Sequence, residues 1–163
     1  MKIKYFSWLP AAAIMGAIFW FSSKTADISQ ESSLSISLVI LNVFEQLKSI
    51  PISEPERLEL LAVIDHFVRK SAHFTEYACL SAAIAFHFTV WKKNISYRTF
   101  IPIIITGLYA ATDEFHQTFV PGRSGQVSDV LLDTAGAAAG ALAFYILNLL
   151  FTRRRQRKIK PTA

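Results

Sequence analysis

Long runs of apolar residues alternate with polar segments along this 163-residue chain. Each run approaches the roughly 20 residues that an α-helix needs to cross about 30 Å of hydrocarbon. The pattern predicts an all-α fold, a four-helix bundle integral to a membrane, with one domain at 1–152 and a basic tail at 153–163. The expected spans cover about residues 5–22, 72–91, 99–119 and 130–151.

The polar segment between the first two runs has helical periodicity of its own. Leu34, Leu38 and Leu41 share one face of an expected helix at about 28–48. Ser53 and Glu56 match a capping box at the start of a second amphipathic stretch, at about 54–70. We expect two helices on the outer surface of the membrane, which either cover the bundle or form a lid or lipid-facing shelf beside a site.

Basic residues predict the orientation, because Lys and Arg beside short loops are retained in the cytoplasm. With both termini cytoplasmic, eleven of the seventeen basic residues lie on that side. They are Lys2, Lys4, Lys92, Lys93, Arg98, Arg153, Arg154, Arg155, Arg157, Lys158 and Lys160. All twelve acidic residues then lie on the other side or enter the helices from it. A multi-pass protein with both termini cytoplasmic is therefore expected.

The net charge of +5 does not favour nucleic acid as a partner. Its excess is concentrated in the 92–98 loop and the 153–163 tail, and such juxtamembrane clusters contact anionic membrane lipids and set topology. Cys79 is the only cysteine, so the chain cannot form an internal disulfide.

Ionisable side chains gather near one end of three of the expected spans. Such groups are costly inside a membrane and normally face the bundle interior, where they pair with one another. Helical spacing places several of them on shared faces. One face around the start of the second span carries Lys70, His73, Glu76 and Tyr77. One face at the end of the third carries Asp113, His116 and the polar Gln117, with Glu114 roughly a third of a turn round. The start of the fourth carries Asp129 and Asp133, one turn apart. Their matching depth points to a common site.

A tight turn, residues 119–125, carries one guanidinium between the third and fourth spans. Pro121 presets the backbone angle, and the glycines at 122 and 125 permit positive φ. Arg123 is suited to bidentate capture of a phosphate or carboxylate. The competing interpretation is an internal salt bridge from Arg123 to Asp129 or Asp133.

These polar motifs resemble the VanZ-like family of bacterial membrane proteins. The resemblance rests on residues 70–77, 113–125 and 129–136, together with Phe21-Ser22-Ser23 at the end of the first span, and it covers nearly the whole chain. It implies a small multi-helix protein of the bacterial cytoplasmic membrane and cell envelope. It also implies an association with low-level resistance to the glycopeptide teicoplanin, without naming a reaction.

The first functional hypothesis is an acid/base enzyme that acts on a lipid-linked or envelope component at the outer leaflet. We expect Glu76 and His116 to transfer protons and an aspartate, 113 or 133, to orient an imidazole. We expect Arg123 and Lys70 to hold an anionic group. Candidate catalytic residues are Glu76, His116, Asp113, His73, Glu114 and Asp133; candidate substrate-binding residues are Arg123, Lys70, Gln117, Asp129 and Tyr77.

Other functions fit the same residues. One is a non-catalytic protein that binds a glycopeptide or an anionic lipid headgroup, which needs Arg123 but no acid and base. Another is a proton- or ion-coupled carrier, although the ionisable groups cluster at one end and leave no continuous path. No cofactor is expected; a divalent metal held by His73-x-x-Glu76 and Asp113-x-x-His116 is the alternative. The cluster could also be a polar network that only locks the helices together.

Gly136 and Gly140 form a small-residue pair in an Ala-rich part of the fourth span. Such spacing permits close approach of two helices. We interpret it first as a packing face inside the bundle and second as a contact between protomers of a homo-oligomer.

Overall fold

The structure is a computed structural model that describes residues 3–48 and 53–159. Lys2 and Lys160, used above for orientation, lie outside the described residues. The described part of the chain is helical, with no strand, which confirms the all-α prediction. Its elements are α1 (Ile3–Phe6), α2 (Leu9–Ser22), α3 (Ala26–Lys48), α4 (Glu54–Val90), α5 (Ile95–Gln117) and α6 (Val127–Ile159).

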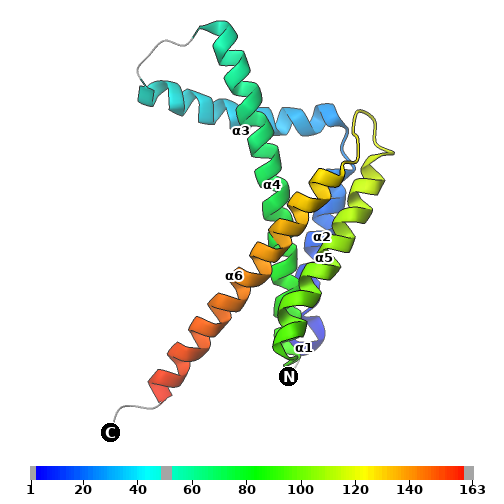
Figure 1. The fold of residues 1–163 in the computed structure, drawn as a ribbon, viewed down its shortest axis with the longest axis vertical. Coiled ribbons are helices and arrows are strands. Elements are labelled where there is room, and N and C mark those ends of the chain that lie inside the picture. The colour runs from blue at the N-terminus through cyan, green and yellow to red at the C-terminus, as the bar shows by residue number, and fades with distance from the viewer. Residues whose placement is uncertain (1–2, 49–52, 160–163) are drawn as a thin grey trace.

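The second half of α4 packs beside α2 and α5, and α6 crosses them at an angle (Figure 1). Helix α3 lies across this group near the loop that joins α5 to α6. We call that end the loop end; α1 and the last turns of α6 lie toward the opposite, terminal end. Two hydrogen bonds attach the first helices to the rest: Ser7 Oγ to His87 Nδ1 at 2.9 Å, and Tyr109 Oη to the Met15 carbonyl at 2.8 Å.

Local capping explains where two helices begin. The predicted capping box is present: the Ser53 amide donates to Glu56 Oε2 at 3.1 Å, and Ser53 Oγ accepts from the first turn of α4. The Ser53 hydrogen bonds hold the pKa of the exposed Glu56 carboxyl below its usual range. Asn94 caps α5 by accepting a hydrogen bond from the Tyr97 amide at 3.1 Å.

The structure corrects the prediction of a separate surface helix at 54–70. Residues Glu54–Val90 form one continuous helix, because no Gly or Pro follows Pro55 to break it. Its first half therefore continues the axis of the second predicted span instead of lying flat. The expected helix at 28–48 agrees closely with α3. Helix α6 likewise continues through the basic residues to Ile159, so the described part of the predicted tail is helical.

Polar contacts hold α3 against the first half of α4. Asp65 is buried at 4% exposure and accepts a hydrogen bond from the fully buried Ser37 Oγ at 3.3 Å. The Arg69 guanidinium also approaches Asp65, with Nε 3.5 Å from Oδ2. Farther along, Arg57 pairs with Glu45 at 2.9 Å. These contacts fix α3 at the loop end, where it can line a site.

Replacing Asp65 by Ala is expected to loosen α3. The change removes the hydrogen bond from Ser37 to the Asp65 carboxylate, which joins α3 to α4, while Ser37 Oγ keeps the Ser33 carbonyl of its own helix at 2.8 Å. A hydrogen bond to a charged group is worth about 1.5–3 kcal/mol. Amide hydrogen exchange over residues 33–41 should become faster, whereas Glu59→Ala, at an exposed position of the same helix, should leave it unchanged. Equal exchange in both variants would show that Asp65 does not hold α3.

Small residues allow α4 and α6 to cross closely, and this pair makes the most extensive helix–helix contact in the described chain. A Cβ at Gly136 would overlap the Phe74 carbonyl, and one at Gly140 would overlap the Ala78 carbonyl. The packing of Gly136 and Gly140 inside the bundle is thereby confirmed. A homo-oligomer stays a prediction, and this glycine pair is already covered by α4.

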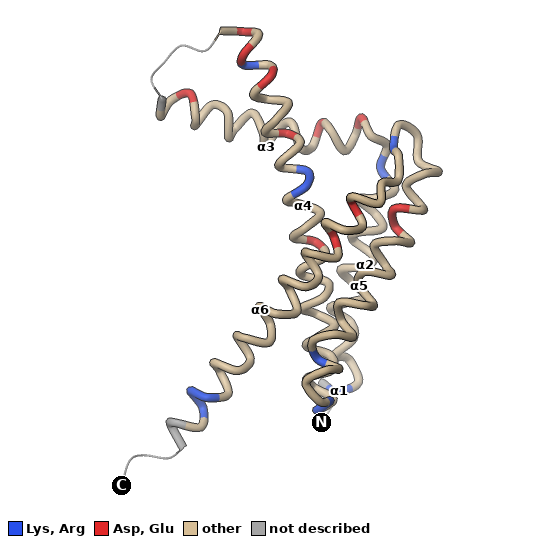
Figure 2. Tube along the Cα trace, in the orientation of Figure 1, with Lys and Arg blue, Asp and Glu red and all other residues tan. Residues whose placement is uncertain are grey.

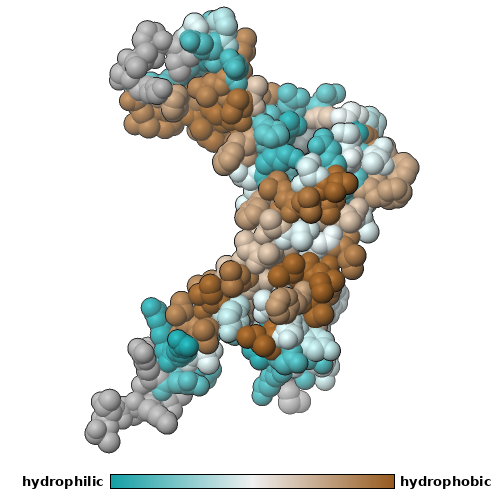
Figure 3. Space-filling view, viewed as in Figure 1, coloured by the Kyte–Doolittle hydropathy of each residue, from teal (hydrophilic) through white to brown (hydrophobic). Residues whose placement is uncertain are grey.

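Two helical stretches of the described residues are long and apolar enough to cross a membrane: Lys4–Ser22 and Val127–Gln156. Acidic residues lie in the loop-end half of the molecule, and the terminal end carries basic residues (Figure 2). Apolar surface covers much of the middle of the bundle between more hydrophilic ends (Figure 3).

Candidate functional site

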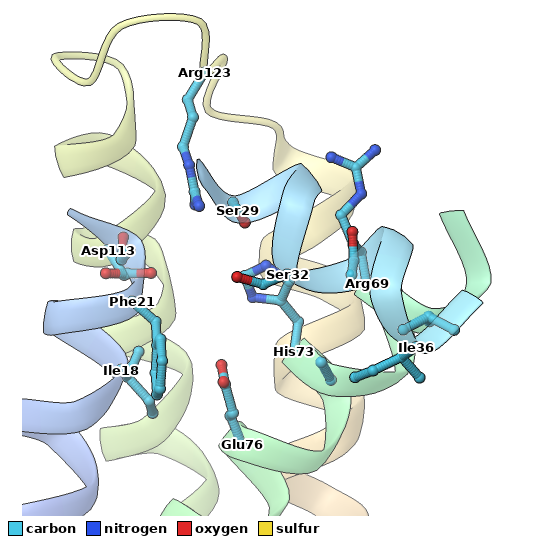
Figure 4. Close-up of a pocket in the computed structure, with 14 residues that line it drawn as sticks. Ile18, Phe21, Ser29, Ser32, Ile36, Arg69, His73, Glu76, Asp113 and Arg123 are labelled. Carbon is cyan, nitrogen blue, oxygen red and sulfur yellow. The ribbon is translucent and has the colours of Figure 1, made fainter. Parts of the chain in front are cut away.

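A cavity of about 280 Å³ lies at the loop end, enclosed by α2, α3, α4, α5 and the α5–α6 loop. Helix α4 contributes His73 and Glu76 on one face, and α5 contributes Asp113 (Figure 4). Arg123 extends from the loop into the same space. The sequence predicted all four as site residues, and the structure brings them together around one cavity.

A second cavity of about 230 Å³ adjoins the first, with Ser29, Arg69, His73 and Arg123 in both linings. It is lined further by three predicted site residues, Lys70, Gln117 and Asp129. The Lys70 ammonium forms an ion pair with the Asp129 carboxylate. The polar space at the loop end thus has two connected parts, with Arg123 and His73 between them.

Arg123 forms no ion pair with any carboxylate in residues 3–48 and 53–159. The predicted alternative of a salt bridge to Asp129 or Asp133 is therefore not found, because Lys70 takes Asp129 instead. Burial lowers the pKa of the Arg123 guanidinium from its usual range, and the nearby Asp113 carboxylate opposes that shift. The guanidinium remains a cation available to a ligand.

The backbone of the α5–α6 loop positions the Arg123 side chain toward the first cavity. Gly122 has a φ of 77°, a backbone conformation that residues with a side chain rarely adopt. A Cβ at Gly125 would overlap the Glu114 carbonyl, so only glycine lets the loop lie so close to α5. Glu114 Oε2 also accepts a hydrogen bond from the Gln126 amide at 2.9 Å. Glu114 therefore acts here as an anchor for the loop.

Asp113 is held by two neighbours. The fully buried Tyr77 donates its hydroxyl to Asp113 Oδ2 at 3.1 Å, and Gln117 Nε2 donates to the same oxygen at 3.1 Å. The predicted shared face of Asp113 and Gln117 is thus observed, with Tyr77 completing the group from α4. These contacts orient Asp113 toward the cavity and place Tyr77 and Gln117 as its support.

Four predicted residues are absent from the linings of both cavities: Tyr77 and Glu114, described above, and His116 and Asp133. The His116 ring packs against Phe19 of α2, with ring centroids 4.9 Å apart. Asp133 is fully buried on α6, and neither carboxyl oxygen has a hydrogen-bond partner among the described residues. His73, whose buried Nδ1 also has no described partner, is the imidazole that shares the cavity with Glu76.

The cavity includes residues that sequence reasoning did not select. Arg69 lines both cavities, although it was not among the predicted site residues. Ser29, Ser32 and Ser33 reach the cavity from α3, where their helical spacing was the available signal. Apolar Ile18 and Phe21 of α2 complete the wall. Phe21 belongs to the Phe21-Ser22-Ser23 motif that carried the family resemblance, whereas nothing in the sequence distinguished Ile18 from other apolar span residues.

The two predicted metal-ligand pairs take different positions in the structure. Within the described ranges, no group of three or more His, Cys, Asp or Glu side chains is placed to hold a metal ion. His73-x-x-Glu76 does face the cavity, but His116 contacts Phe19, so the two predicted ligand pairs do not converge.

Comparison with protein families matches residues 7–148 to the VanZ/LLP1 family. The chain belongs to this family. The match spans the first cavity's helices and the Arg123 loop, and it confirms the resemblance found in the polar motifs. Comparison with curated proteins gives no significant match. Comparison with solved structures also gives none. Family membership and two sufficiently apolar helices are together consistent with a membrane protein.

Proposed function

We propose that this VanZ/LLP1 protein is a multi-pass protein of the bacterial cytoplasmic membrane, a four-helix bundle with both termini in the cytoplasm. Large apolar side chains are exposed along α2, α5 and α6, as expected of surfaces that face lipid. The acidic loop end and the basic terminal end agree with the positive-inside orientation. In this arrangement the two cavities open at the outer face.

The function that the geometry supports best is action on an anionic, lipid-linked or envelope component at the outer face of the membrane. One observation carries this proposal: the unpaired Arg123 guanidinium ends in a cavity with His73 and Glu76. A guanidinium binds a phosphate or carboxylate through two parallel hydrogen bonds. The contacts of Arg123 within the described chain leave these donors unused.

The same cavity contains groups suited to proton transfer. Glu76 and His73 lie one turn apart on the same face of α4, and Figure 4 shows both directed into the cavity. A carboxylate and an imidazole can act as general base and general acid on a substrate held by Arg123. We propose His73 as the imidazole in place of His116, since His116 packs against Phe19.

A non-catalytic binding protein is the second candidate, and one observation favours it. The cavity serines donate to carbonyls of their own helix, Ser32 to Ile28 at 3.1 Å and Ser33 to Gln30 at 3.0 Å. They are therefore not paired with His73 as activated nucleophiles. A binding protein would use Arg123 to retain a glycopeptide or anionic headgroup and would not require proton transfer.

Replacing Arg123 by Gln is expected to abolish the effect of the protein under both candidates. In a sensitive bacterium that expresses the chain, we expect wild type to give low-level teicoplanin protection and Arg123→Gln to remove it. A charge-assisted hydrogen bond is worth about 1.5–3 kcal/mol, which is roughly 10- to 100-fold in binding. The measurement is the inhibitory concentration at matched membrane abundance.

Arg98→Gln is the matched control, because Arg98 lies in the first turn of α5 at the terminal end and outside the linings of both cavities. It should leave protection unchanged. Full protection by Arg123→Gln at normal abundance would contradict a site built around this guanidinium. If the wild-type protein gave no protection, teicoplanin resistance would not be a function of the outer-face site.

A further inference from the structure

A third hollow, of about 500 Å³, runs between α2 and α4. Its lining is mainly apolar: Ile14, Ala17, Ile18 and Phe21 come from α2, and Val68, Ala72 and Cys79 are among the residues from α4. We call this hollow the α2/α4 groove. It spans Val68 to Cys79, which is about 16 Å along the helix at 1.5 Å per residue.

The α2/α4 groove is continuous with the first cavity. Ile18, Phe21, Val68, Ala72 and Glu76 line both spaces. Glu76 is the ionisable residue common to the two linings. The cationic groups of the cavity, Arg69 and Arg123, lie on the loop-end side of Glu76. The groove continues past Glu76 toward the terminal end along Ile14, Ala17 and Cys79, and its polar side chains Ser71 and Thr75 lie on the loop-end side. The combined space therefore changes from polar to apolar along its length.

The groove also opens to the side of the molecule. Ala17, Thr75 and Cys79 are exposed, and Phe21 is 58% exposed, although each lines the groove. In a membrane-spanning bundle this side faces hydrocarbon, so a chain can enter from the bilayer without crossing water. A ligand taken up by this route carries its polar group toward the loop end.

We propose that the ligand of this site is a membrane lipid with a phosphate headgroup, whose hydrocarbon chain lies in the α2/α4 groove. The phosphate contacts Arg123, and Arg69 and the Lys70–Asp129 pair border the same polar space. The proposal rests on the proposed outer-face site and specifies its substrate class. Charge complementarity selects an anionic headgroup, and the continuity of groove and cavity selects an amphiphile over a soluble anion.

The geometry assigns separate roles to the two parts. The groove provides affinity by burying methylene groups. The cavity provides selectivity, because a zwitterionic headgroup adds a second cation close to Arg69 and Arg123. Glu76 lies at the junction, where the headgroup joins the chain. The reacting or recognised bond of such a lipid is therefore expected near its phosphate and not within its chain.

The test is native mass spectrometry of the detergent-solubilised full chain with defined lipids. The lipids are phosphatidylglycerol, a polyprenyl phosphate and phosphatidylcholine with the same acyl chains as the phosphatidylglycerol. Glycerol 3-phosphate is the headgroup without a chain. We expect at least one anionic lipid to bind about tenfold or more tightly than phosphatidylcholine and glycerol 3-phosphate. A preference for phosphatidylglycerol would identify the source as a phospholipid, and one for the polyprenyl phosphate would identify a lipid carrier.

Substitutions test the two parts separately. Ala17→Trp fills the groove and should weaken binding of the anionic lipid about tenfold or more. Thr75→Phe fills it from α4 and provides a second variant at an exposed position. Ala12→Trp, at an exposed position of α2 outside the groove lining, is the matched control and should bind as wild type. Arg123→Gln should remove the preference over phosphatidylcholine.

Failure of this inference is distinguishable from failure of the proposed function. Suppose that glycerol 3-phosphate binds as tightly as the anionic lipid and that its binding requires Arg123. This result would overturn the proposal of a lipid ligand and leave the proposed anion site intact. Unchanged lipid binding in both groove-filling variants would also overturn it. If anionic lipid and phosphatidylcholine bound equally to wild type and equally to Arg123→Gln, and that variant also gave full teicoplanin protection, both the lipid and the anion site would be overturned.

Discussion

Replacing Glu76 by Gln is expected to abolish the protection that the protein gives while leaving it folded and inserted. Glutamine keeps the size and shape of the side chain but replaces one acceptor oxygen by an NH2 donor and cannot accept a proton at neutral pH. General acid–base catalysis typically contributes about 10²- to 10⁴-fold to a rate, so its loss should return susceptibility to that of cells without the protein. Teicoplanin susceptibility at matched membrane abundance measures the effect.

Glu31→Gln provides the control, because Glu31 is exposed on α3 and lies outside the cavities. It removes the same charge from the same end of the molecule. Full protection by Glu76→Gln together with loss in Arg123→Gln would contradict the enzyme and favour the binding protein. Reduced abundance of both variants would point to a polar network that only holds the helices together.

The choice between the two imidazoles follows from the same assay. His73→Gln should reduce teicoplanin protection as much as Glu76→Gln does if His73 is the partner of Glu76 in proton transfer. His116→Gln should reduce protection less, because the His116 ring packs on Phe19 outside the cavity lining. The opposite order would restore the pairing of Glu76 with His116 that helical spacing first suggested.

Helical periodicity predicted much of the site, since residues on one face of one helix must point the same way. His73 with Glu76 and Asp113 with Gln117 were found on this basis. Periodicity cannot give the rotation of one helix about its axis relative to its neighbours. His116 was therefore placed in the site although α5 turns it toward Phe19.

The continuous helix α4 shows a second limit of the sequence pattern. A change from amphipathic to apolar composition near residue 70 suggested two helices, but composition does not bend a backbone. Without Gly or Pro, the hydrogen-bond ladder from Glu54 to Val90 continues. The sequence pattern also could not predict that α3 packs against α4, because the buried contact of Ser37 with Asp65 joins residues far apart in the chain.

Adding one methyl group at Gly140 is expected to disrupt the fold more than any change in the cavity. In Gly140→Ala the new Cβ overlaps the Ala78 carbonyl, and both helix backbones must move apart to admit it. Overpacking of a close contact typically costs about 1–3 kcal/mol, and here no flexible side chain can yield. Thermal unfolding in detergent and membrane abundance should both fall.

Gly16→Ala is the matched control for this prediction. The substitution is the same, also in a helix, but a Cβ at Gly16 meets nothing within 4 Å. Since Ala is favoured over Gly in helices by about 1 kcal/mol, this variant should be as stable as wild type or more so. If Gly140→Ala were equally well tolerated, the close crossing of α4 and α6 would be incorrect. The positions of His73 and Glu76 relative to α6 would then have to be reconsidered, because the same stretch of α4 carries both the crossing and the site.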